Sequence, residues 1–242
     1  MENQKQKELA NHHISVDCVV LGFDGKELYV LLIKRMGVDN GEEFHDMKLP
    51  GSLIYKDEDL DNAAKRVLHE LTGLKNVNLS QFKAFGSKDR TSDPKDVRWL
   101  ERSTQEHIER IVTIAYLSLV KLNRTIEHTM DKSRSIWMPI KDIPTLAFDH
   151  NIIIRDSLQY IRQYLEANPC LMFELLPRKF TIAQLRLLHE VIYRKKIDNR
   201  NFYKRIIQVS YIVPLDEYET NVAHRAARYY KFDKVIYNKS LR

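Results

Sequence analysis

Two glutamates and an arginine between Leu49 and Leu74 could hold a metal ion or a charged ligand. Glu58 follows a Leu-Pro-Gly turn, and Arg66 and Glu70 stand four residues apart in a stretch whose apolar residues recur with helical spacing. Side chains three or four residues apart share one face of a helix. Because Mg²⁺ prefers several hard oxygen ligands in near-octahedral geometry, Glu70 with Glu58 alone makes a poor metal site. An ion pair of Arg66 with Glu58 or Glu70, joining the loop to the helix, is the better prediction.

The same stretch resembles a Nudix box, a family motif of one glycine, one glutamate and an Arg-Glu-apolar-x-Glu-Glu-x-Gly-apolar segment. The residues that match it are Gly51, Glu58, Arg66, Leu68, Glu70, Gly73 and Leu74. The spacing departs once, because six residues rather than five separate the first glycine from the glutamate.

The resemblance also identifies what is missing. In that family, glutamates one, four and five residues after the arginine hold the catalytic metal ions, and here these positions are Val67, Glu70 and Leu71. The resemblance therefore implies a Nudix fold without hydrolase chemistry, so we expect no enzyme activity, no metal and no other cofactor. A Nudix hydrolase with an altered metal site stays open as an alternative.

The elements that must position this segment alternate between strands and helices. Strands are predicted at 14–23, 28–33, 82–85 and 111–120, helices at 58–72 and 150–165, and a short edge or turn segment near 137–144. Asp24-Gly25 is a hairpin turn signal, and Gly73 suits the C-terminal cap of the first helix. Two polar stretches, 37–47 and 86–109, are predicted to be loops, and the second is long enough to be functional.

Length and composition exclude several classes of protein. The chain has 242 residues, of which 43% are apolar and 30% charged, and no apolar run approaches the length of a membrane helix. Its two cysteines, Cys18 and Cys170, form neither a C-x-x-C pair nor a zinc pattern. A reduced, cytoplasmic setting is expected, and a secreted disulfide scaffold, a membrane protein and a cysteine-rich zinc module are excluded.

Basic charge is concentrated in the C-terminal part of the chain. Cys170 to Arg242 contains 15 Lys and Arg against 7 Asp and Glu, a net charge of +8, whereas the residues before Cys170 carry −2. A basic excess at one end is typical of a nucleic-acid-binding module. A solvated basic surface that binds nothing explains the charge equally well.

The order of the predicted elements in this part favours a nucleic-acid-binding module over a solvated basic surface. Thr181 can cap a helix, a basic turn follows at 194–197, Asp198 or Asn199 can cap a second helix, and 228–237 is typical of a strand. Helix, short turn, helix and β-loop is the order of a winged helix-turn-helix. A small helical cap that only dimerises is the structural alternative.

A Nudix-like domain joined to a basic winged helix resembles the Nudix-related transcriptional regulators, and 137–150, 176–181 and 198–202 match that family as well. The resemblance implies an α/β (α+β) Nudix-like sandwich followed by a C-terminal winged helix-turn-helix domain. We expect an effector-binding domain at 1–150, a connecting helix at 151–168 and a DNA-binding domain at 169–242.

Within that family the sequence is most similar to the arabinose-responsive regulator of sugar utilisation in gut bacteria. The resemblance alone implies a repressor of carbohydrate metabolism that L-arabinose releases from DNA. Other members sense ADP-ribose and control NAD metabolism, which is the alternative function. The remaining alternative function is a basic module that binds RNA or a protein partner.

The expected partners are double-stranded operator DNA, a small-molecule effector and a second copy of the chain. Asn201 and Arg205 are the predicted base readers, since Asn and Arg make bidentate contacts with adenine and guanine. The residues predicted to contact DNA are Arg178, Lys179, Thr181, Lys195, Lys196, Arg200, Asn201, Lys204, Arg205, Arg225 and Arg228.

The predicted effector residues are Asp17, Lys34, Lys48 and Arg90. Asp17 interrupts an apolar strand, and a buried carboxylate requires a partner or a function, of which structural pairing is favoured. Phe44, Tyr55 and Trp99 could stack on a ligand or belong to the core.

Overall fold

The computed structural model describes residues 10–39, 41–104, 107–108, 110–122, 133–220, 222–223 and 225–240. These residues form two compact units. The second unit consists of Gly22–Leu28, Val120–Leu122 and the described part of Ile161–Arg242, and the first unit holds the rest.

A seven-stranded sheet organises the first unit, with the strand order β3-β2-β1-β6-β5, while β4 pairs with β1 and β7 with β2. The strands are β1 (Ala10–Phe23), β2 (Leu28–Asp39), β3 (Glu42–Lys48), β4 (Gly51–Tyr55), β5 (Ser80–Phe85), β6 (Val112–Lys121) and β7 (Ser135–Pro139). The apolar run in β1 and most residues at the start of β2 are buried, and both segments form the predicted strands.

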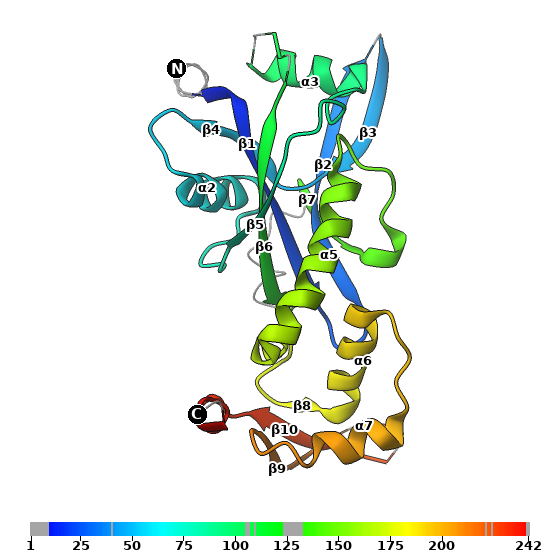
Figure 1. Ribbon diagram of the computed structural model, residues 1–242. Coiled ribbons are helices and arrows are strands. Elements are labelled where there is room, and N and C mark those ends of the chain that lie inside the picture. The colour runs from blue at the N-terminus through cyan, green and yellow to red at the C-terminus, as the bar shows by residue number, and fades with distance from the viewer. Residues whose placement is uncertain are drawn as a thin grey trace. The chain divides into compact units, whose positions relative to one another are not determined.

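Two helices cover this sheet from opposite sides, α2 (Leu60–Thr72) and α5 (His150–Ala167) (Figure 1). The Tyr116 hydroxyl of β6 donates to Asp61 of α2 at 2.6 Å, and Phe82 of β5 packs on Tyr160 of α5 with ring centroids 5.5 Å apart. Gly73 ends α2 at φ 76°, as predicted, and Asp59 caps its N-terminus.

The predicted loop at 37–47 is wrong, because β2 continues to Asp39 and pairs with β3 from Ile33↔Lys48 to Asp39↔Glu42. β3 is an edge strand in which only Lys48 is buried, so it lacks the apolar alternation of a half-buried strand. The Asn40-Gly41 dipeptide was the available signal, since it is a favoured hairpin turn.

The predicted loop at 86–109 contains a helix, α3 (Pro94–Thr104). Pro94 stands at its first position, and Asp93 accepts hydrogen bonds from the backbone amides of the first turn. Its outer residues are charged, and α3 is attached to the sheet through ion pairs rather than through an apolar stripe. This composition explains why periodicity missed it.

The second unit has a three-stranded sheet in the order β8-β10-β9. Its elements are η2 (Pro169–Glu174), β8 (Phe180–Thr181), α6 (Ile182–Tyr193), α7 (Asn199–Ile206), β9 (Ile212–Tyr218), β10 (Arg228–Phe232) and α8 (Lys234–Ser240) (Figure 1). The strand predicted at 228–237 therefore ends at Phe232, where Asp233 caps α8 through two backbone amides.

None of the described helices combines the length and the apolar character needed to cross a membrane.

Candidate functional site

Arg66 joins the loop before α2 to the helix itself. Its Nε donates to Glu58 Oε2 at 2.9 Å and its Nη1 to Glu70 Oε2 at 3.1 Å, which confirms the predicted ion pair. The guanidinium lies 3.8 Å from the centroid of the Tyr55 ring. Burial alone would raise the pKa of Glu58, but hydrogen bonds from Arg66 and the Tyr55 amide hold this pKa below its ordinary value. The Glu58 carboxylate is thus already bound by the Arg66 guanidinium.

Two of the three positions of α2 that would hold catalytic metal ions are apolar. Val67 is fully buried, and Leu71 occupies the other carboxylate position. Among the described residues no three His, Cys, Asp or Glu side chains gather in a way that could hold a metal ion. The residues present do not fit the metal cluster of a Nudix hydrolase.

We expect this protein to show no Mg²⁺-dependent hydrolysis of ADP-ribose above a buffer blank, because Glu58 is occupied by Arg66 and two carboxylates are missing. Chromatographic detection of AMP, which forms with ribose 5-phosphate when the diphosphate of ADP-ribose is hydrolysed, with and without EDTA, checks this. Turnover that EDTA abolishes and that Glu70→Gln reduces by tenfold or more would show a working hydrolase.

A buried charge cluster joins three of the four predicted effector residues. Arg90 Nη2 lies 3.0 Å from Asp149 Oδ1 and 3.5 Å from Asp17 Oδ2, and His150 Nε2 lies 3.4 Å from Asp17 Oδ1. The Leu49 amide donates to His150 Nδ1 at 2.9 Å, so in neutral His150 the proton sits on Nε2 and faces Asp17.

The electrostatics of this cluster follow from burial and pairing. Burial alone would raise the pKa of Asp17, but His150, Arg90 and Lys48 hold it well below its usual range. Burial lowers the pKa of Lys48 to about 8, against the opposing charge of Asp17. Asp17 is therefore an ionised, fully paired carboxylate, which confirms the structural pairing favoured from the sequence.

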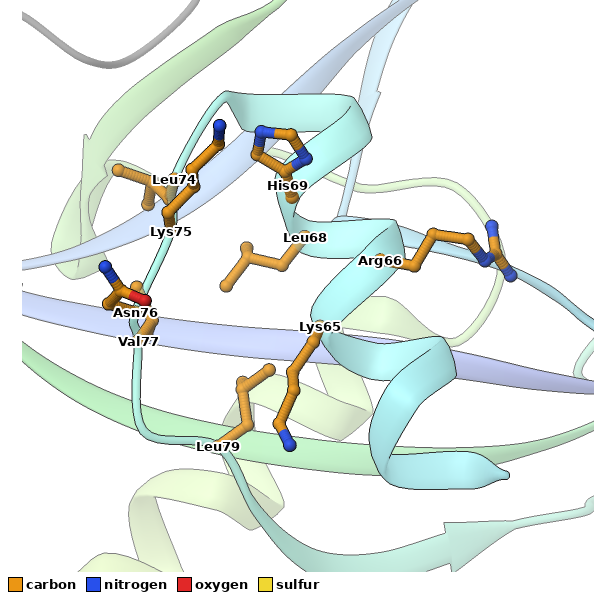
Figure 2. A pocket seen from close by; sticks show the side chains of 9 residues that line it. All are labelled: Lys65, Arg66, Leu68, His69, Leu74, Lys75, Asn76, Val77 and Leu79. Atoms are coloured by element: carbon orange, nitrogen blue, oxygen red, sulfur yellow. The ribbon is translucent and has the colours of Figure 1, made fainter. Parts of the chain in front are cut away.

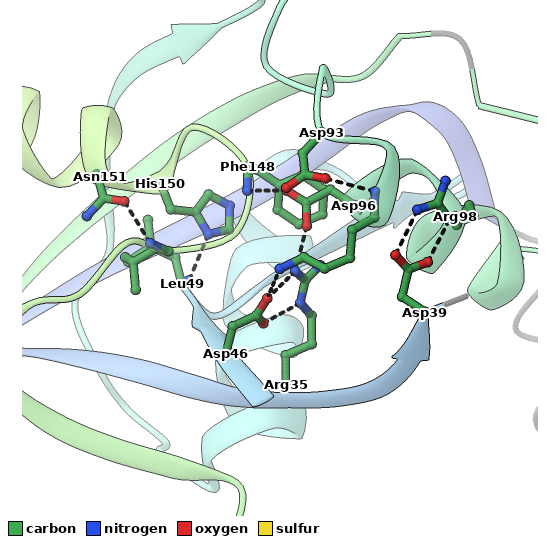
Figure 3. A network of polar contacts seen from close by, with 12 residues as sticks. Arg35, Asp39, Asp46, Leu49, Asp93, Asp96, Arg98, Phe148, His150 and Asn151 are labelled. Atoms are coloured by element: carbon green, nitrogen blue, oxygen red, sulfur yellow. Dashed lines mark hydrogen bonds and ion pairs between the residues drawn. The ribbon is translucent and has the colours of Figure 1, made fainter. Parts of the chain in front are cut away.

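Arg35 forms the centre of a second network, which sequence reasoning missed (Figure 3). It is 3% exposed, forms a bidentate pair with Asp46 at 2.6 Å and reaches Asp96 of α3 at 2.5 Å. The other oxygen of Asp96 accepts from the Phe148 amide at 2.7 Å. Phe44, Trp99 and Phe148 surround the guanidinium, each ring centroid within 5.4 Å.

The two networks adjoin, since Lys48 Nζ lies 5.5 Å from the Trp99 ring centroid. Phe44 and Trp99 thus belong with the charged groups, whereas Tyr55 lies on Arg66. Lys34 is exposed and alternates with Arg35 across the two faces of β2. Its role in effector binding stays a prediction.

A pocket of about 540 Å³ lies between α2 and the 74–79 segment (Figure 2). Its floor is apolar and its rim basic, with lining residues Lys65, Arg66, Leu68, His69, Leu74, Lys75, Asn76, Val77 and Leu79. The Arg66 side chain points away from the 74–79 segment. On a helix of 3.6 residues per turn, Lys65 and His69 lie roughly opposite Val67 and Leu71, so this pocket is no part of the degenerate metal face.

In the second unit, α6 and α7 form a helix-turn-helix whose caps were predicted correctly. Thr181 and Gln184 form a capping box at α6, and the Asp198 side chain accepts from the Asn201 amide at 2.9 Å. The Thr181 hydroxyl is therefore already used, and the residue is 2% exposed. This burial corrects its assignment to the DNA interface.

The other residues predicted to contact DNA differ in exposure and in their bonds to neighbouring residues. Those that are exposed are Arg178, Lys179, Lys195, Lys196, Arg200, Asn201, Lys204, Arg205 and Arg225. Lys179 pairs with Glu217, and Arg228 is half-buried, donating to the Leu215 carbonyl at 2.6 Å and to Asp216 at 2.7 Å. Arg228 thus braces β10 against β9.

The faces of α7 are set by Phe202, which is buried against His189 of α6 with ring centroids 5.3 Å apart. With 3.6 residues per turn, Arg200 and Lys204 point roughly away from Phe202. Arg205 lies on the flank near His189, where its charge acts on that imidazole. Arg200 and Lys204 are therefore better oriented for a groove than Arg205.

His189 should make the second unit sensitive to acid. Burial, with a smaller effect of Arg205, lowers its pKa to about 4 from 6.5. The unfolded state then binds more protons between these values, so stability is complete above pH 6.5 and falls as the pH drops toward 4. We expect His189→Phe, which keeps the ring, to remove up to about 1.4 kcal/mol per pH unit of this slope. Urea unfolding at four pH values measures it, and an unchanged slope would exclude His189 as its source.

Two families of domain match the chain. Residues 11–160 match the NUDIX domain, and residues 172–232 match the NrtR DNA-binding winged helix domain. A relative from Acinetobacter baylyi, described as "ADPR responsive transcriptional repressor NtrR", is 24% identical over 223 residues, which cover 90% of this chain and 81% of the relative.

Solved structures show the same fold. NrtR of Shewanella oneidensis, in complex with a 27mer DNA, matches with a TM-score of 0.64 at 23% identity, over 91% of this chain and 93% of that one. A MutT/nudix family protein from Enterococcus faecalis matches with a TM-score of 0.58 at 23% identity, over 92% and 88% of the two chains. These matches confirm the predicted Nudix-like domain followed by a winged helix.

Proposed function

Because this chain belongs to the Nudix family and ends in an NrtR-type winged helix, we propose that it is a transcriptional repressor whose Nudix unit binds a small-molecule effector. The observation that carries the proposal is α7, a capped helix whose outward face bears Arg200 and Lys204. A Nudix unit that lacks two of the three metal carboxylates suits ligand sensing better than hydrolysis.

The DNA-binding mode follows from this orientation. We place α7 in the major groove, with Arg200 and Lys204 facing the base edges or the phosphates beside them. Lys195 and Lys196, in the turn before α7, and Arg178 supply phosphate contacts. A homodimer on a pseudo-palindrome is the expected assembly, and effector binding changes the spacing of its two α7 helices.

ADP-ribose is the first candidate effector, because the relative from A. baylyi is described as ADPR responsive. None of the relatives described above is called arabinose-responsive, so L-arabinose rests on the sequence resemblance and on one structural observation. The two arginines of these networks already form ion pairs: Arg35 with Asp46 and Asp96, and Arg90 with Asp17 and Asp149.

This pairing bears directly on the choice of effector. A diphosphate requires cations whose charge is not already neutralised, whereas a neutral sugar binds through paired polar groups and an aromatic face. Carboxylates already neutralise Arg35 and Arg90, and this pairing is compatible with a neutral ligand. A neutral sugar such as L-arabinose is therefore the second candidate effector. Trp99 and Phe44 are the rings best placed to stack on either ligand.

Fluorescence anisotropy on DNA from upstream of the gene, with and without each ligand, tests the proposal. We expect competitor-resistant binding that ADP-ribose or L-arabinose weakens at least tenfold, and Trp99→Ala to lose the response while keeping DNA affinity. Tyr164→Ala, an exposed aromatic of α5 in the second unit, is the matched control. Binding to any DNA with equal affinity, indifferent to both ligands, would overturn the repressor proposal.

A further inference from the structure

The outward side of α7 carries apolar side chains beside its cations. Tyr203 is 47% exposed and Ile207, at the C-terminal cap, is 49% exposed. Single exposed apolar residues are ordinary on protein surfaces. These two, however, stand four residues apart on one side of the helix, interleaved with Arg200 and Lys204.

Neither side chain is free to fold back into the core. Phe202 already fills the buried position of α7. The Tyr203 hydroxyl is hydrogen-bonded to Tyr230 of β10, and the Ile207 amide donates to the Tyr203 carbonyl at 3.1 Å, which continues the helical turn. Both side chains are therefore presented by fixed backbone.

The major groove offers one apolar group at the base edges, the 5-methyl of thymine. Cations on the same helix side can bind phosphates or guanine, but an isoleucine beside them gains only from apolar contact. We propose that Ile207, with the Tyr203 ring beside it, recognises thymine methyl groups, so that each operator half-site carries thymine opposite α7. This inference rests on the proposed function and extends it to base specificity.

Deoxyuridine scanning of the operator tests the inference, because replacing thymine by uracil removes the methyl and leaves the pairing edge intact. We expect one or two positions per half-site to lose affinity about three- to fivefold, the value of one buried methyl. Ile207→Ala should bind thymine and uracil DNA equally at one of these positions. Val235→Ala, an exposed apolar residue of α8, should keep the full thymine preference.

The outcomes separate this inference from the proposed function. Tight operator binding that is indifferent to uracil at every position would overturn the inference and leave the repressor standing. Affinity lost by Ile207→Ala equally on both DNAs, together with a change of oligomeric state in sedimentation, would assign the apolar pair to contacts between copies. Tyr203→Phe, which keeps the ring, and circular dichroism melts control for folding.

Discussion

Replacing Arg200 and Lys204 together with alanine is expected to lower operator affinity by 100-fold or more. Each side chain points away from the buried Phe202, and a groove contact from such a residue contributes roughly 1–3 kcal/mol. The caps of α7, Asp198 and Ile207, are untouched, so the helix should fold as before. Anisotropy titrations at several salt concentrations measure both the affinity and its salt dependence.

The control removes the same charge elsewhere. Lys65→Ala with Lys75→Ala takes two exposed cations from the basic rim of the pocket beside α2, and it should leave operator affinity within about twofold. If the two double variants lose affinity equally, net charge rather than α7 governs binding. A salt slope that falls by about 0.9 per cation would identify phosphate contacts, whereas loss confined to operator DNA would identify base contacts.

Gly51→Ala is expected to destabilise the first unit by about 3 kcal/mol, the upper part of the range for overpacking a core. A Cβ built at Gly51 would lie 1.8 Å from Asp17 Oδ1 and 3.0 Å from the Val16 carbonyl. Asp17 cannot retreat, because His150 and Arg90 hold it. Urea unfolding followed by tryptophan fluorescence reports the change, since both tryptophans lie in the first unit.

A matched glycine tests whether the effect belongs to this contact. A Cβ at Gly86 would meet the Val112 side chain at 3.3 Å, with the backbone at an ordinary φ. Gly86→Ala should therefore cost less than about 1 kcal/mol. Equal losses at both glycines would mean that chain flexibility, rather than the approach of Asp17, explains the glycine at position 51.

Local signals in the sequence predicted the elements that carry their own caps. The helix at 60–72 was visible in its apolar spacing and in Gly73, and α6 and α7 in Thr181 and Asp198. The edge strand β3 and the charged helix α3 were missed because neither buries an apolar stripe. Each still had a short turn or capping signal, Asn40-Gly41 and Asp93-Pro94.

The candidate sites likewise divide into local contacts, which the sequence predicts, and long-range contacts, which it does not. The Glu58–Arg66–Glu70 ion pairs lie within one local segment and were predicted. The network of Arg35 joins β2, β3 and α3. Asp96 stands 61 positions after Arg35, so no local spacing rule predicts their contact. The orientation of α7 was likewise hidden, because the sequence shows which residues are basic but not which flank lies near His189.

The second unit is not formed from one contiguous stretch of chain. It includes the end of the β1–β2 hairpin, Gly22–Leu28, and the end of β6, Val120–Leu122. Gln184 of α6 comes within 3.1 Å of a Cβ built at Gly25, and Leu122 lies against Gly22. A fragment that begins at residue 161 would lack both segments and expose the surfaces they cover. Moving this unit into another protein with these contacts intact would therefore require three separate stretches of chain.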